Sequence, residues 1–254
     1  MAPHQFHGED DLLRTRLYER LRRPPSASTV PGTLPVLFFG DLFKAEVATI
    51  GLNPSDQEYL TREGSLLFGP AQRFATTASL GADNRSALSD EQCAAAVERM
   101  RAYYDPGKPV FGAWFSALSR VIEGLGVRFR DRTAAHLDLV QESTRPVWSA
   151  LGRVEREELL KQDLPFLAWE LREFSLRAVI CNGKTVGVHV RRELGVSVAE
   201  ESKIARIKWW VGHAEVDGRR IAFGGWNVPL ARPTGLGREG ETALGELLAR
   251  KLGL

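Results

Sequence analysis

Two hydrophobic patterns alternate along this chain. In one, apolar residues recur at the spacing of a helix, and in the other, short runs consist mainly of apolar residues. Between Asp10 and Arg23, leucines recur among charged residues at the interval of one helix face, and the pattern stops at Pro24. The same spacing predicts further helices over residues 89–104, 111–124, 156–174, 184–194 and 241–252. The first of these opens with Ser-Asp-Glu-Gln, which is typical of a capping box.

The short apolar runs predict strands. They cover residues 34–41, 45–52, 134–140 and 176–183, and an alternating stretch over 206–226 turns at Asp217-Gly218 and forms a hairpin or two strands. Because strands alternate with helices, we expect an α/β fold with a mostly parallel sheet covered by helices on both faces. We expect residues 1–30 to form an N-terminal helix and linker, and residues 31–254 to form a single domain.

The composition excludes several classes of protein. With 254 residues, 43% of them hydrophobic, the chain can bury a full core and is not disordered. A formal net charge of +2 neither requires nor excludes a polyanionic partner. Two cysteines are too few for a thiolate zinc site or an iron–sulfur cluster, so we expect no metal and a reducing, cytoplasmic setting. Because no run has the length of a membrane span, we expect a soluble protein, and we expect a monomer.

Amide and acidic side chains end or follow several of the predicted strands. Asn53 follows the strand over 45–52, and Asn182 lies near the end of the strand over 176–183. His136 and Asp138 lie within the strand over 134–140, and the loop 226–237 joins the last strand to the last helix. Because the carboxyl ends of parallel strands meet at one edge of a sheet, we expect these segments to converge on one site.

Four of these segments carry a resemblance to a known family. GLNPS at 51–55 looks like the GINPG motif of the mismatch-specific uracil and thymine branch of the uracil-DNA glycosylase superfamily. Residues 66–74, LLFGPAQRF, resemble its FPF and NRF segment, and AVICNGK at 178–184 is similar to its FNGK turn. Asn227 stands where the family has its NPSG loop, and the match covers roughly residues 34–252 in order and topology.

The resemblance implies a fold and a reaction. The family has a three-layer α/β/α fold with a central four-stranded parallel sheet, and it cleaves the N-glycosidic bond of a base flipped out of DNA without a metal or cofactor. By resemblance, Asn53 orients the attacking water, since an amide can position a nucleophile but cannot take its proton. Asp56 is the nearest carboxylate that could act as the base. The alternative for Asn53 is an Asx turn at the strand exit.

Recognition of the base would fall to other loops. Phe68 looks like the aromatic that stacks on the flipped base, a contact worth about 1–3 kcal/mol, although ordinary core packing is the alternative. The remaining residues that we assign to base binding are Gly51, Ser55, His136, Asp138 and Asn182.

Asp138 departs from the family, which often has an amide at this place. Alternation along a strand puts His136 and Asp138 on one face. A carboxylate only accepts hydrogen bonds, so it would repel O4 of uracil and favour the exocyclic amine of cytosine. The alternative is a solvent-exposed or ion-paired aspartate at a strand end.

The closing loop, NVPLARPTG, departs too, because it lacks the family's histidine. Asn227 could hydrogen-bond the leaving base or a phosphate, and Leu230 or Arg232 could fill the vacated place in the base stack. The predicted phosphate contacts are Ser55, Arg73, Lys184 and Thr185.

We therefore expect a monofunctional DNA glycosylase that removes a pyrimidine. The acceptor at Asp138 favours a modified cytosine, and some members of the superfamily act in bacterial antiviral defence on modified phage bases. Repair of uracil or another deaminated base is the alternative within the class. A catalytically inactive DNA-binding protein of the same fold is the alternative outside it.

Overall fold

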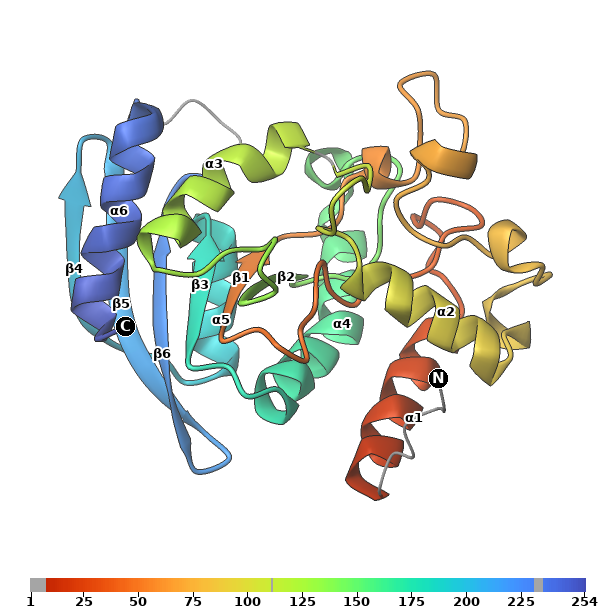
Figure 1. Ribbon diagram of the computed structural model, residues 1–254, viewed down its shortest axis with the longest axis horizontal. Coiled ribbons are helices and arrows are strands. Elements are labelled where there is room, and N and C mark those ends of the chain that lie inside the picture. Colours follow the sequence, from red (N-terminus) through yellow and green to blue (C-terminus); the bar gives the residue numbers. More distant parts are fainter. Residues whose placement is uncertain (1–7, 111, 231–234) are drawn as a thin grey trace.

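The computed structural model of the protein describes residues 8–110, 112–230 and 235–254, and it is α/β. Its strands form one mixed sheet in the order β2-β1-β3-β6-β5-β4 (Figure 1). Strands β1 (Val47–Gly51), β2 (Ala134–Asp138), β3 (Ala178–Asn182) and β6 (Arg219–Trp226) run parallel to one another. Strands β5 (Ile207–Val216) and β4 (Ser197–Ile204) extend the sheet in antiparallel pairing. The sheet therefore has six strands instead of the four expected, and it is mixed because two of them are antiparallel.

Helices cover both faces of this sheet. Helices α3 (Gly112–Gly124) and α6 (Gly237–Leu252) lie on one face, and α4 (Arg153–Glu173) and α5 (Lys184–Glu193) lie on the other (Figure 1). The crossing of α3 and α6 depends on glycine, because a Cβ on Gly245 would lie 2.0 Å from the carbonyl oxygen of Val121. Strands β1, β2 and β3 are buried along their whole length, as expected for strands between two helical layers.

Two more helices lie beside the β2 end of the sheet. Helix α2 (Asp90–Arg101) begins with the predicted capping box, in which the Ser89 hydroxyl accepts from the Gln92 N–H and the Gln92 side chain accepts from the Ser89 N–H. Helix α1 (Gly8–Arg22) is fixed to the rest of the chain by buried Arg20, whose guanidinium pairs with Glu142 and Asp163 at 3.2 and 2.8 Å.

One strand prediction was wrong, and one strand was not predicted. Residues 34–41 are almost entirely buried but form only an isolated bridge from Phe39 to His136, because Pro35 lacks an N–H and Gly40 takes a φ of +85°. Strand β4 was missed because seven of its eight residues carry no large apolar side chain toward a core, and its burial pattern is that of an exposed edge strand. Within the described part of the chain, no helix combines the length and hydropathy of a membrane span.

Candidate functional site

A cavity of about 330 Å³ opens at the carboxyl ends of β1 and β2. Its lining comes from the loop after β1, from the end of β2, from the start of α3 and from residues 144–149. Five predicted site residues with polar side chains line it together: Asn53, Ser55, Asp56, His136 and Asp138. The convergence expected for the ends of parallel strands is thus found at β1 and β2.

The Asn53 side chain is held at one end only. Its amide nitrogen donates to the backbone oxygen of Glu142 and to the Thr144 hydroxyl, both at 3.3 Å, and to the carbonyl of Pro54 at 3.2 Å. None of the described residues donates a hydrogen bond to the Asn53 side-chain oxygen, so this oxygen can accept one from a water in the cavity. The fixed amide nitrogen sets the orientation of that acceptor.

Buried ion pairs hold the segment on which Asn53 rests. The Glu142 carboxylate receives two hydrogen bonds of 2.8 Å from Arg85 and further ones from Arg20 of α1. Burial raises the pKa of Glu142, and the two guanidinium groups lower it by more, so the net pKa lies below its ordinary value. Arg20 and Arg85 are therefore positioning residues for Asn53, acting through the chain at Glu142.

Gly51, the last residue of β1, makes room for the pair opposite it. A Cβ at this position would lie 2.4 Å from Asp138 Oδ1 and 2.9 Å from His136 Nε2. The Thr49 hydroxyl lies 2.7 Å from His136 Nδ1, and His136 Nε2 lies 3.4 Å from Asp138 Oδ1. The Thr49 hydroxyl also donates to the Ala135 backbone oxygen at 3.4 Å. Gly51 thus has a steric role next to His136 and Asp138.

Asp138 is buried and lies at the floor of the cavity, which excludes the solvent-exposed alternative. Burial raises the pKa of Asp138 above its ordinary value, and the neighbouring His136 opposes that effect. The Asp138 side chain lines the cavity and can accept hydrogen bonds there. The Asp138 backbone oxygen accepts one from the Gln141 side-chain amide.

Aromatic rings form the walls, but Phe68 is not among them. Phe39, Trp114 and Phe115 surround the His136 ring at centroid distances of 5.2, 4.8 and 5.3 Å, and all three line the cavity. Phe68 is 82% exposed and is absent from the lining, so the core-packing alternative is wrong for it and the expected stacking position is not reached in this structure. Trp148 closes the cavity on the side of α4.

Glu58 is a cavity residue that the sequence analysis missed. It is 3% exposed, and the Tyr103 hydroxyl donates to both of its carboxyl oxygens at 2.9 Å. Burial raises the pKa of Glu58 to about 8, against the opposing effects of the Tyr103 hydroxyl and Arg73. At neutral pH the Glu58 carboxyl therefore keeps its proton and offers both a donor and an acceptor, as an amide would.

The residues predicted at the ends of β3 and β6 have other contacts. The Asn182 carbonyl oxygen accepts from Trp226 Nε1 at 2.9 Å and from the Leu230 N–H at 3.0 Å, so it joins the closing loop to β3. The Asn227 side-chain oxygen accepts from the Lys208 backbone N–H at 2.8 Å. Both residues lie at the same sheet edge as Asn53 but outside its cavity. Leu230 is buried, which does not suit a wedge, and Arg232 lies outside the described residues.

The predicted phosphate contacts are divided among different places. Ser55 lines the cavity and caps the turn after it, because its hydroxyl accepts from the Gln57 N–H. The Arg73 guanidinium donates to the Gln57 backbone carbonyl at 2.6 Å and lies 3.9 Å from the Glu58 carboxylate. It therefore contacts the turn that carries Glu58 and does not line the cavity. Lys184 and Thr185 are exposed at the start of α5.

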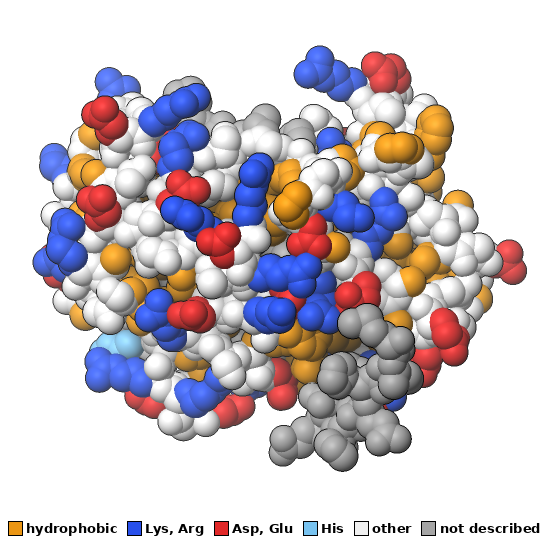
Figure 2. Space-filling view, viewed as in Figure 1, with side chains coloured by type: hydrophobic (Ala, Val, Ile, Leu, Met, Phe, Trp, Pro, Cys, Tyr) orange, Lys and Arg blue, Asp and Glu red, His pale blue; other side chains and the backbone are white. Residues whose placement is uncertain are grey.

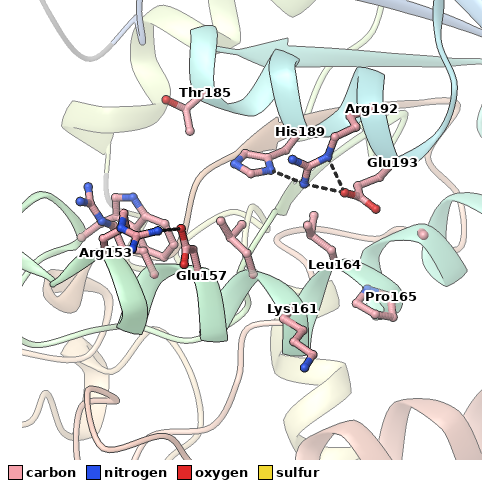
Figure 3. Close-up of a pocket in the computed structure, with 13 residues that line it drawn as sticks. Arg153, Glu157, Lys161, Leu164, Pro165, Thr185, His189, Arg192 and Glu193 are labelled. Atoms are coloured by element: carbon pink, nitrogen blue, oxygen red, sulfur yellow. Dashed lines mark hydrogen bonds and ion pairs between the residues drawn. The ribbon is translucent and has the colours of Figure 1, made fainter.

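A second hollow, of about 640 Å³, lies between α4 and α5 and has Thr185 on its rim (Figure 3). It shares Trp148 with the Asn53 cavity. Its charged groups are partly satisfied internally, since Arg153 pairs with Glu157 at 2.8 Å and Arg192 pairs with Glu193 at 2.7 Å (Figure 3). The side chains that could position a water or read a base edge lie in the smaller cavity, which is therefore the candidate site.

The sequence contains little that would assign Trp114, Trp148 or Glu58 to the site. Trp114 and Trp148 lie far from Asn53 along the chain, and Trp114 reads as part of an amphipathic helix. Glu58 lies in the same loop as Asn53, but only the fold shows that this acid is buried. Among the described residues, no group of three His, Cys, Asp or Glu side chains is placed to hold a metal ion. No protein-family model matches the chain, and no curated protein matches it.

Proposed function

We propose that this chain is a monofunctional DNA glycosylase that removes a pyrimidine base. The observation that carries the proposal is the Asn53 cavity: an amide anchored through its nitrogen, with its oxygen available, at the mouth of an aromatic-walled hollow that ends in polar side chains. A base must leave the duplex to be cut from its sugar, and such a hollow suits an extruded base. The resemblance of the GLNPS segment to the glycosylase motif supports the same reaction.

The reaction needs a positioned water and a place for its proton. The water attacks C1′ of the deoxyribose as the bond to the base nitrogen breaks, and the base departs with the bonding electrons. Asn53 accepts a hydrogen bond from the water and orients it, while Asp56, on the same cavity wall, takes the proton. The departing base anion takes up a proton from solvent, and Asp56 later returns its proton to solvent, so the products are a free base and an abasic site.

The floor of the cavity selects the base. Asp138 presents an acceptor, which favours an exocyclic amine such as that of cytosine. Glu58, with a pKa of about 8, is protonated at neutral pH and can donate to a pyrimidine carbonyl, where negative charge develops as the base leaves. We propose a modified cytosine as the substrate. Uracil or another deaminated base is the alternative, and it would bind only with Asp138 protonated.

Oligonucleotides with single defined bases test this proposal. The set contains uracil, thymine opposite guanine, hypoxanthine, hydroxymethyluracil and glucosylated hydroxymethylcytosine, and alkali converts each abasic site into a strand break visible on a gel. Cleavage of the cytosine-derived base supports the proposal, whereas cleavage of uracil alone supports repair of deaminated bases.

One observation favours the inactive alternative. The Asn227 side chain, expected to assist the leaving base, is bonded to the Lys208 backbone and lies outside the cavity. If every oligonucleotide binds and none is cleaved, the chain is a DNA-binding protein of this fold, and the glycosylase proposal is wrong.

A further inference from the structure

The antiparallel strands β4 and β5 bring basic residues to the same edge of the sheet as the Asn53 cavity. Strand β5 pairs with β6 so that Trp209 lies opposite Trp226, the last residue of β6. The two-residue turn between β4 and β5, Ala205-Arg206, therefore lies at the carboxyl edge of the parallel strands (Figure 1). Nothing in the parallel sheet requires this hairpin, yet it extends the edge on which the candidate site opens.

The hairpin and α5 together form a basic hollow. Its volume is about 570 Å³, and the cations on its lining are Lys184, Arg191, Lys203 and Lys208, with Glu201 as the acid. None of these four cations lies within ion-pair distance of a carboxylate of a described residue, whereas many other surface arginines of the chain are paired with an acid. On the opposite face of the sheet, which carries α6 and is seen in Figure 2, acidic and basic side chains are interspersed.

Two of the lysines face each other across neighbouring strands. Lys203 of β4 is the direct cross-strand partner of Lys208 of β5, and both are exposed. Like charges in directly opposite positions destabilise a sheet. A pair that costs stability in the isolated protein, at the mouth of a hollow, indicates an anionic ligand that offsets the repulsion when bound.

The floor of the hollow is rigid and aromatic. Trp209, Trp210 and Trp226 line it and are buried, and the Arg191 guanidinium lies 5.1 Å from the centre of the Trp210 ring. Stacking on this ring fixes the Arg191 side chain, so that its charge is presented at low entropic cost. The hollow therefore combines one cation fixed by stacking, Arg191, with a floor of buried tryptophan rings.

The spacing along the edge suits a polymer. From β1 to β4 the order runs through β3, β6 and β5, which at about 4.8 Å per strand is about 19 Å, or about five to six nucleotides of one DNA strand at about 3.4 Å each. We propose that the β4–β5 hairpin and the start of α5 bind the phosphodiester backbone of the DNA strand that carries the extruded nucleotide. This inference rests on the proposed glycosylase function, and it assigns the hairpin a role in strand binding outside the base cavity.

The salt dependence of binding tests the inference. Each phosphate contact that is lost lowers the slope of log affinity against log salt by about 0.9. The test variant is Lys203→Ala/Lys208→Ala, and the matched control is Lys44→Ala/Arg220→Ala, which removes two exposed cations from the opposite edge of the sheet. The probe is a short fluorescein-labelled duplex with a central tetrahydrofuran abasic-site analogue, whose use does not depend on the identity of the excised base.

We expect the hairpin variant to bind more weakly with a slope reduced by about two, and the control to match the wild type. The variant Lys203→Arg/Lys208→Arg restores the slope. Thermal unfolding without DNA separates this effect from misfolding, because removal of the lysine pair leaves the unfolding temperature unchanged or higher.

The outcomes distinguish the two proposals. If the wild type forms abasic sites but the hairpin variant keeps the wild-type slope, the hairpin inference is wrong and the glycosylase proposal stands. If the wild type binds DNA with the expected dependence on the lysines but cuts no base, the hairpin inference stands without the glycosylase. If the wild type does not bind the duplex at any salt concentration, both are wrong.

Discussion

Replacement of Glu58 by glutamine should remove a pH dependence of stability that the fold builds into the cavity. The Glu58 carboxyl has an ordinary pKa of 4.5 and a pKa of about 8 in the folded protein because of its burial. Between these values the folded state holds a proton that the unfolded state has lost, so the wild type loses stability as the pH rises through this window. At about 1.4 kcal/mol per pH unit, the loss reaches at most about 5 kcal/mol by pH 8.

Glutamine keeps the shape and the donor and acceptor of a protonated carboxyl but does not titrate. We expect Glu58→Gln to unfold like the wild type in urea at pH 5 and to be several kcal/mol more stable at pH 9, followed by tryptophan fluorescence. Glu63→Gln, an exposed change in the same loop, serves as the control and should follow the wild type. Equal differences between Glu58→Gln and the wild type at both pH values would refute a buried, protonated Glu58.

Three further substitutions test the packing around the site. Gly51→Ala should cost about 1–3 kcal/mol of stability in thermal unfolding, since its Cβ would lie 2.4 Å from Asp138 Oδ1, and an unchanged unfolding temperature would contradict the described contact. Glu142→Gln should cost about 3–5 kcal/mol in urea unfolding because Arg85 loses its buried acid and Arg20 keeps only Asp163; a loss below 1 kcal/mol, roughly the value of a surface pair, would argue against the network. Ala205→Gly should gain about 1 kcal/mol, because Ala205 has a φ of +50°, and a loss of stability would show that no strain exists there.

The helices and the buried strands could be predicted because their patterns are local. Ser89 and Gln92 formed the expected capping box, and Asp217-Gly218 formed the expected hairpin turn, with φ values of +49° and +75°. Strand β4 and the buried loop 34–41 could not be predicted in this way. An apolar run indicates that a segment is buried, but it does not indicate whether the backbone of that segment pairs with a neighbouring strand.

Part of the candidate site could also be predicted from the sequence. Asn53, His136 and Asp138 come from the ends of adjacent parallel strands, so the topology alone brings them together. The roles predicted for Asn182 and Asn227 depend on side-chain direction, and both amides instead hold the chain around Trp226 and Lys208. The burial of Glu58, which sets its protonation, has no signature in the sequence.

The central claim is that the Asn53 amide positions a water for attack on the sugar of an extruded nucleotide. The most direct measurement is the amount of free base released per abasic site formed, followed by chromatography for the wild type and Asn53→Ala, with DNA binding measured in parallel. The account predicts one free base per abasic site for the wild type, and release at least about 100-fold slower for Asn53→Ala while it still binds DNA. Equal release rates for the two proteins, or bound DNA with no base released by the wild type, would contradict it.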